Sequence, residues 1–161
     1  MLKILTFTFN SFGENCSLAW DETGEGVIID PGFYNDAEAQ ALFGKIAEKQ
    51  VRPVMVLLTH GHFDHIFGVK ECADKYGIPV YMNQEDNYVL QHNFSQVFGL
   101  KEPDTSFSTL PLDWSGSLNG WRKGLWVRSS EIMVLWPWPG KTVTSPGMPM
   151  SLSINETINL S

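Results

Sequence analysis

The feature that most constrains this chain is a continuous apolar run at residues 54–58, followed by the polar segment His60-Gly61-His62-Phe63-Asp64-His65. An apolar run of this kind predicts a β-strand that is buried on both of its faces. Such a strand needs helices or a second sheet on either side, so we expect a layered fold. The polar segment then lies at the carboxyl end of the strand, where α/β proteins build their sites.

The segments before this run predict the other parts of such a fold. Residues 2–9 alternate enough to form a strand, and residues 16–20 and 26–30 flank a polar turn, which indicates a hairpin. An amphipathic helix is predicted from Asp36, acting as its N-terminal cap, to about residue 50. A hairpin followed by alternating helices and strands predicts an α/β (α+β) fold with helices packed on a sheet.

Three further elements are predicted after the apolar run. Residues 66–76 predict a helix that ends at Gly77, and residues 78–82 predict a short strand. Residues 84–98 predict another helix, with Tyr88 and Val89 turned toward the core and Phe94 as a further candidate. These elements continue the alternation of strand and helix.

The polar segment contains residue types that bind metals. In an extended chain, residues two apart face the same way, so His60, His62 and Asp64 can converge on one side. His65 begins the next helix and can turn toward the same space. Imidazole nitrogens and carboxylate oxygens are good ligands for zinc, iron or manganese. Three of the chain's four histidines lie here, which favours a metal site over a surface loop that carries histidines by chance.

The segment Thr59–His65 closely resembles the His-x-His-x-Asp-His signature of the metallo-β-lactamase superfamily, especially its small glyoxalase II-like hydrolases. Asn15-Cys16 at the start of a strand and the Ile29-Asp30-Pro31-Gly32 stop also follow that family's order. The resemblance is good over about residues 1–85 and looser to about residue 111. It implies an αββα sandwich with two metals at one edge of the sheets.

The resemblance also implies roles for individual residues. His60 and His62 would hold a first metal, and Asp64 and His65 would hold a second. Asp30 would orient a ligand without contacting a metal; the alternative is an ordinary turn aspartate. Zinc is the expected metal, with iron or manganese as alternatives. The implied reaction is hydrolysis of small thioesters or esters, as in hydroxyacylglutathione hydrolases. A metal-bound hydroxide would attack a small-molecule substrate, and Asp64 would also orient that nucleophile.

Ligands that the family takes from later segments are missing from this sequence. No histidine follows His92, and no aspartate follows Asp113. Two later Pro-Gly segments carry Lys141 or Met148 where the family has histidine. A lysine ammonium has no lone pair, and a thioether is too soft for a hydrolytic zinc. A second hypothesis is therefore a truncated, non-catalytic homologue that binds at most one metal weakly, so whether the chain is an enzyme stays open.

The composition changes sharply after residue 111. Residues 1–111 carry 15 acidic and 7 basic side chains, whereas residues 112–161 carry 3 and 4, together with five of the six tryptophans. We therefore predict a metallo-β-lactamase-like portion with the metal motif at 1–111. Residues 112–161 would be a divergent Trp-, Pro- and Ser-rich tail of the same domain, with strands predicted at 123–127 and 131–135. Either a reading-frame shift in the gene or genuine divergence explains this tail.

The remaining composition argues against several partners. A formal net charge of −7 argues against nucleic acid or an anionic membrane as the main partner. No segment is apolar enough to span a membrane, and the first residues show no signal peptide. Cys16 and Cys72 are expected to be buried, reduced thiols, which fits a cytoplasmic protein. The oligomeric state is left open by the sequence.

Overall fold

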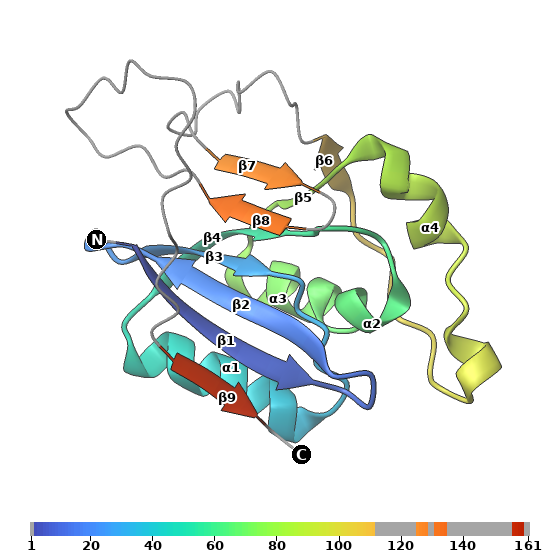
Figure 1. The fold of residues 1–161 in the computed structure, drawn as a ribbon, viewed down its shortest axis with the longest axis horizontal. Helices are drawn as coiled ribbons and strands as arrows, with labels where there is room; N and C mark the ends of the chain where they lie inside the picture. The colour runs from blue at the N-terminus through green and yellow to red at the C-terminus, as the bar shows by residue number, and fades with distance from the viewer. Residues whose placement is uncertain (1, 112–124, 129–130, 135–155, 160–161) are drawn as a thin grey trace.

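The computed structural model describes residues 2–111, 125–128, 131–134 and 156–159 (Figure 1). The strands are β1 (Lys3–Phe9), β2 (Glu14–Trp20), β3 (Glu25–Ile29), β4 (Arg52–Leu57), β5 (Val80–Met82), β6 (Thr109–Pro111), β7 (Leu125–Arg128), β8 (Glu131–Val134) and β9 (Glu156–Asn159). The α-helices are α1 (Asp36–Glu48), α2 (Phe63–Ile66), α3 (Val69–Tyr76) and α4 (Asn87–Gln91), and the 3-10 helices are η1 (Gln84–Asp86) and η2 (Ser95–Phe98).

The described strands form a seven-stranded sheet in the order β6-β5-β4-β3-β2-β1-β9, with β7 and β8 paired separately. Strand β2 runs antiparallel to both of its neighbours, β1 and β3, so the predicted hairpin is confirmed. From β3 to β6 the neighbouring strands are parallel. The mixed α/β fold expected from the sequence is therefore present, and parallel strands surround the apolar run.

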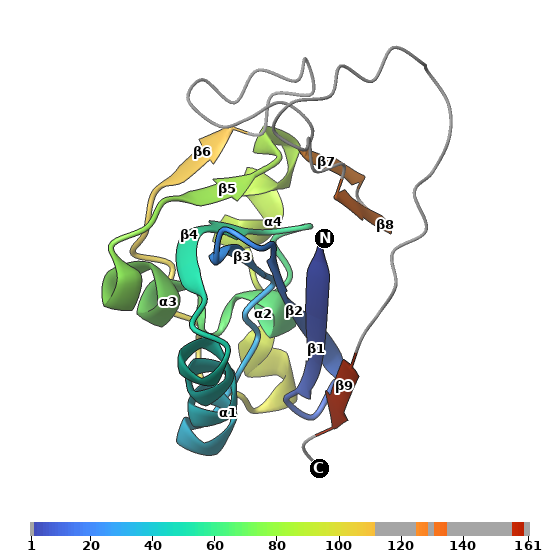
Figure 2. The same cartoon turned by 90° about the vertical axis from the view of Figure 1, so that its left-hand side faces the viewer.

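The apolar run is buried on both faces of the sheet, as predicted. Val56 and Leu58 belong to the core cluster that also contains the inward residues of α1 and α3. Met55 and Leu57 belong to a second buried cluster on the opposite face. Figure 2 shows α1 and α3 on one side of the sheet and the β7–β8 pair on the other. Within the described residues, elements on both sides of the sheet thus give the layered architecture that the buried apolar run at residues 54–58 predicts.

Helix α1 confirms the predicted helix but not its cap. The capping residue is Asn35, whose side chain accepts a hydrogen bond from the backbone N–H of Glu38 at 3.0 Å. Asp36, the predicted cap, is already the first helical residue. Its charge still favours the helix because it lies at the positive end of the helix dipole.

The predicted helix at 66–76 corresponds to α3, which begins three residues later, at Val69; Phe67 and Gly68 separate it from α2. The Gly68 N–H donates to the carbonyl of Pro31 at 2.8 Å. A Cβ at position 68 would lie 2.3 Å from the Phe33 ring, so only glycine fits. Helix α3 ends at Gly77 with φ of 63°, as the sequence predicted. The bend lets the chain pass close to the loop that follows β3.

The predicted helix at 84–98 is wrong as a single element. The segment divides into η1, α4 and η2. Leu90 is buried, whereas Tyr88 is 69% exposed and stacks on His92 with ring centroids 4.2 Å apart. With Tyr88 facing outward, Leu90 is the one buried residue of α4, so the segment lacks the apolar stripe that holds a long helix against a core.

Strands β7 and β8 coincide with the two strands predicted in the tail, shifted by at most two residues. The two Pro-Gly segments that carry Lys141 and Met148 lie outside the described residues. Cys16 and Cys72 are free and buried, as predicted. No helix in the described part of the chain combines the length and apolar character needed to cross a membrane.

Candidate metal centre

The candidate site lies at the carboxyl ends of two adjacent parallel strands. Strand β3 ends at Ile29, which pairs with Leu57 of β4, so Asp30 comes next to the segment that leads to His60. The Asp30 N–H donates to the Leu57 carbonyl at 2.9 Å. The sheet register therefore brings together residues that are 30 positions apart in the sequence.

The three histidines of the polar segment converge. The ring centroid of His60 is 4.4 Å from that of His62 and 4.1 Å from that of His65. His60 and His65 are partly buried, whereas His62 is exposed. Asp64 lies beside them, with its Oδ2 3.6 Å from Nε2 of His65. The predicted ligands thus occupy one small region at the sheet edge.

Asp30 is the buried support of this region. Its backbone has a positive φ of 47°, which is uncommon for a residue other than glycine and marks a sharp turn. Its Oδ1 accepts the Thr59 backbone N–H at 2.8 Å, and its Oδ2 accepts the Thr59 hydroxyl. The same Oδ2 lies 3.1 Å from Nδ1 of His65. Asp30 therefore contacts both ends of the histidine segment.

His60 is held with one nitrogen occupied. Its Nδ1 lies 2.9 Å from the Thr59 hydroxyl, which leaves Nε2 for another partner. Burial, followed by the positive charges that His65 and His62 would carry, lowers the pKa of His60 below its ordinary value. The imidazole is therefore neutral at pH 7 and keeps a lone pair for a cation.

These groups fit a metal ion. Asp30, His60 and His65 each offer one ligand atom, and these atoms lie within 4.8 Å of one another. The Asp30 carboxylate also contacts Thr59 and His65. These contacts are compatible with two roles: Asp30 orients the histidines, or it binds the metal directly. Clustered imidazole and carboxylate groups of this kind are typical of zinc, iron or manganese sites.

Glu14 is a buried acid of this region that the sequence reasoning missed. Its side chain is fully buried, and its Oε1 lies 3.8 Å from Nδ1 of His65. Neither carboxyl oxygen makes a hydrogen bond of good geometry within the described part of the chain. Burial, and then the charges of Asp30 and Asp64, raise the pKa of Glu14 to about 10. A signal was available, because Glu14 is two residues before the buried Cys16 and so shares its face of β2.

Gly61 lets η1 and α4 approach the histidines. A Cβ at position 61 would lie 2.6 Å from the backbone nitrogen of Leu90 and 3.0 Å from the carbonyl oxygen of Asp86. Burial raises the pKa of Asp86, and charge on His60 and His62 opposes this rise. Asp86 is thus a second acid near the site that the sequence did not indicate.

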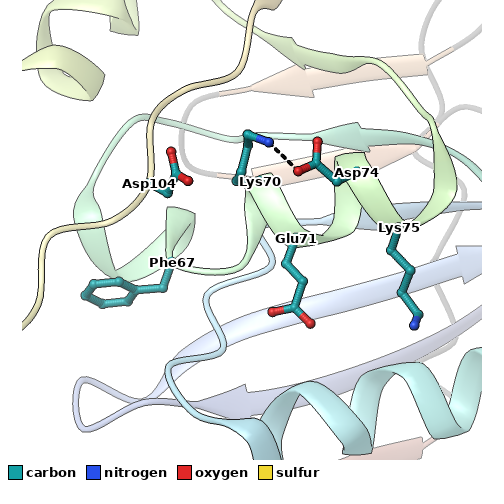
Figure 3. A pocket seen from close by; sticks show the side chains of 6 residues that line it. All are labelled: Phe67, Lys70, Glu71, Asp74, Lys75 and Asp104. Atoms are coloured by element: carbon teal, nitrogen blue, oxygen red, sulfur yellow. Dashed lines mark hydrogen bonds and ion pairs between the residues drawn. The ribbon is translucent and has the colours of Figure 1, made fainter.

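A surface pocket of the described residues lies elsewhere. Figure 3 shows it over the outer face of α3, lined by Phe67, Lys70, Glu71, Asp74, Lys75 and Asp104. Lys70 and Asp74 form an ion pair there. The pocket contains none of the histidines, so it is separate from the candidate metal centre.

Comparison with known sequences agrees with the geometry of the site. Residues 10–138 match the profile of the Metallo-beta-lactamase superfamily. Hydroxyacylglutathione hydrolase GloC of Haemophilus influenzae is 34% identical over 116 residues, which cover 70% of this chain and 51% of that protein. The probable metallo-hydrolase YqgX of Bacillus subtilis is 42% identical over 60 residues, covering 37% of this chain and 26% of that protein. The chain thus spans about half, or less, of these relatives' length.

Solved structures show the same fold. The crystal structure of BLEG-1 B3 metallo-beta-lactamase superposes with a TM-score of 0.61 at 31% identity, covering 74% of this chain and 56% of that one. The structure of TTHA1623 in a di-iron-bound form superposes with a TM-score of 0.57 at 28% identity, covering 70% and 56%.

Proposed function

Because the chain belongs to the metallo-β-lactamase superfamily, we propose that it is a metal-dependent hydrolase of small thioesters or esters, with hydroxyacylglutathione-type thioesters as the leading substrates. The observation that carries the proposal is the convergence of three imidazoles and Asp64 on one sheet edge, with Asp30 behind them. The 34% identity with hydroxyacylglutathione hydrolase GloC supports the substrate class.

The proposed metal ligands are the four side chains that the signature indicates. His60 and His62 would hold one metal, and Asp64 and His65 would hold a second. Zinc is the first candidate. Iron is the second, supported by the di-iron-bound form of the structural neighbour TTHA1623, and manganese also suits these ligands. When bound, the metals supply a Lewis acid that polarises the substrate carbonyl and activates water for attack.

The chain's own residues prepare the site for that chemistry. The Thr59 hydroxyl donates its one proton to Asp30 and therefore accepts from Nδ1–H of His60, which orients the His60 ring and leaves the lone pair on Nε2. Asp30 faces Nδ1 of His65 and directs Nε2 outward. Asp64, whose side chain is 20% exposed, is proposed to orient the attacking water by accepting its hydrogen bond.

The alternative is a non-catalytic homologue that holds at most one metal weakly. One observation favours this alternative. Every proposed ligand in the described part of the chain comes from the single segment His60–His65. A site built from one loop leaves coordination positions to be filled by other groups. Turnover separates this alternative from the proposed hydrolase.

The test is hydrolysis of a hydroxyacylglutathione thioester by the purified chain after loading with zinc, iron or manganese. The thiol released is measured with a chromogenic reagent. His60→Ala should reduce kcat/KM at least 100-fold. His92→Ala is the matched control, since His92 lies outside the cluster and contacts Tyr88, and should leave kcat/KM within about twofold.

Turnover that needs His60 but not His92 would support the hydrolase. Metal binding without turnover of thioesters or esters would favour the non-catalytic alternative. Equal turnover in the wild type and His60→Ala would refute the proposed site.

A further inference from the structure

One side chain outside the histidine segment joins it to two distant parts of the chain. Asn10 follows β1, and its backbone has a positive φ of 48°. Its Nδ2 donates to the carbonyl oxygens of Gly32 and Asp64, both at 2.9 Å. Its Oδ1 accepts the backbone N–H of Phe12 at 2.9 Å. Asn10 therefore links three parts of the chain: the β1–β2 turn, the loop after β3, and the single helical turn α2, which carries Asp64 and His65 (the Asp64–His65 turn).

Asn10 is itself fixed by a buried carboxylate. Oε1 of Glu38 accepts the Asn10 backbone N–H at 2.9 Å, and Oε2 accepts the Tyr34 N–H at 2.6 Å. Glu38 belongs to the first turn of α1 and is only 8% exposed. The backbone N–H of Asn10 is thus anchored to helix α1, and this fixes the residue whose side-chain amide contacts Gly32 and Asp64.

The backbone of Gly32 passes so close to Asp64 that a side chain at position 32 would collide with it. A Cβ at position 32 would lie 2.0 Å from the Asp64 carbonyl oxygen. The two carbonyl oxygens that Asn10 contacts carry the same partial charge, so they need a donor between them. The Asn10 amide supplies both hydrogens from one nitrogen, which neither an aspartate nor a small apolar residue can do.

We propose that Asn10 is a positioning residue, which holds the Asp64–His65 turn so that both side chains are placed to bind a metal. This assignment rests on the proposed function, because it concerns ligands of that site. The Asp64 carbonyl is fixed by Asn10, and the His65 N–H donates to the His62 carbonyl at 3.1 Å. These two hydrogen bonds hold the backbone from which both side chains extend. Asn10 contacts no metal itself.

The test measures zinc affinity by competition with a chromogenic chelator. Asn10→Asp keeps the size of the side chain but sets carboxylate oxygens against two carbonyls. Asn10→Gly tolerates the positive φ and removes the amide, so it serves if Asn10→Asp folds poorly. Asn15→Asp makes the same chemical change at an exposed residue of the same hairpin and is the matched control. We expect zinc affinity to fall about 10- to 100-fold in the two Asn10 variants and to stay within twofold in Asn15→Asp.

A double-mutant cycle separates positioning from general loss of stability. Combining Asn10→Asp with His65→Ala should weaken zinc binding beyond His65→Ala by less than Asn10→Asp weakens it in the wild type, because part of the Asn10 effect acts through His65. A fully additive loss would overturn the proposal. So would a lower melting temperature of the metal-free Asn10 variants with zinc affinity unchanged. A wild-type chain that binds no zinc would refute the proposed function and this assignment together, whereas zinc binding that is insensitive to Asn10 would refute this assignment alone.

Discussion

Replacing Glu14 by glutamine is expected to stabilise the metal-free protein increasingly as the pH rises. The Glu14 side chain is fully buried beside His65, and its pKa is raised to about 10, first by burial and then by Asp30 and Asp64. In the unfolded chain the same carboxyl has its ordinary pKa near 4.5. Between these two values the folded protein holds a proton that the unfolded chain releases. The free energy of unfolding of the wild type therefore falls as the pH rises through this window.

The size of the effect follows from the pKa shift. One proton of difference between the folded and unfolded states changes the free energy of unfolding by about 1.4 kcal/mol per pH unit. Between pH 6 and pH 8 the wild type should lose about 3 kcal/mol that Glu14→Gln keeps, because an amide does not ionise. For a chain of this size that corresponds to a difference of roughly 6–12 °C in melting temperature.

The assay is urea denaturation at pH 6, 7 and 8 in the presence of a chelator, since a bound metal would change the local charge. Glu48→Gln is the matched control, because Glu48 is on the surface and its pKa is lowered by Lys45 and Lys49. That variant should follow the pH dependence of the wild type. Parallel curves for the wild type and Glu14→Gln would refute the reasoning, since they would mean that Glu14 titrates normally in the folded protein.

Three further predictions concern the fold around the site and the pH dependence of metal binding. Gly32→Ala would place a Cβ 2.0 Å from the Asp64 carbonyl oxygen and should destabilise the protein by about 1–3 kcal/mol; an unchanged urea midpoint would contradict this. Asn35→Ala removes the bond that caps α1 and should cost about 1 kcal/mol, and a melting temperature equal to the wild type would count against that cap. Because the pKa of His60 is lowered below its ordinary value of 6.5, protonation of His60 should not compete with zinc between pH 8 and pH 7. Replacing His60 by Ala should therefore cost the same zinc affinity, measured by calorimetry, at both pH values; a cost clearly smaller at pH 7 would contradict this.

The sequence predicted those parts of the fold that depend on local patterns. The apolar run at 54–58 implied a strand covered on both faces, and Met55 and Val56 are fully buried on opposite faces of β4. Gly77 ends α3 in the left-handed conformation, because glycine adopts that conformation without a steric cost. Segment 84–98 was misjudged, because whether Tyr88 faces inward depends on the rest of the fold.

Sequence patterns did not indicate Asn10 or Glu14, the residues that contact the site from outside the histidine segment, for a related reason. The hydrogen bond from Asn10 to Asp64 joins residues 54 positions apart, and no local pattern indicates such a partner. Glu14 shares its strand face with Cys16, which gave a signal of burial, but its approach to His65 depends on how β2 packs against α2. By contrast, the ligand-type residues of the signature lie within six consecutive positions, so their spacing alone indicated the chemistry.

The most direct test of a metal centre at His60–His65 is the zinc content of the purified chain after exhaustive dialysis, compared with His60→Ala and His92→Ala. Our account predicts that zinc is retained by the wild type and by His92→Ala and is lost from His60→Ala. Melting temperatures of the metal-free proteins, measured alongside, should show that His60→Ala is folded. Zinc retained equally by folded His60→Ala, or by none of the three proteins, would contradict the account.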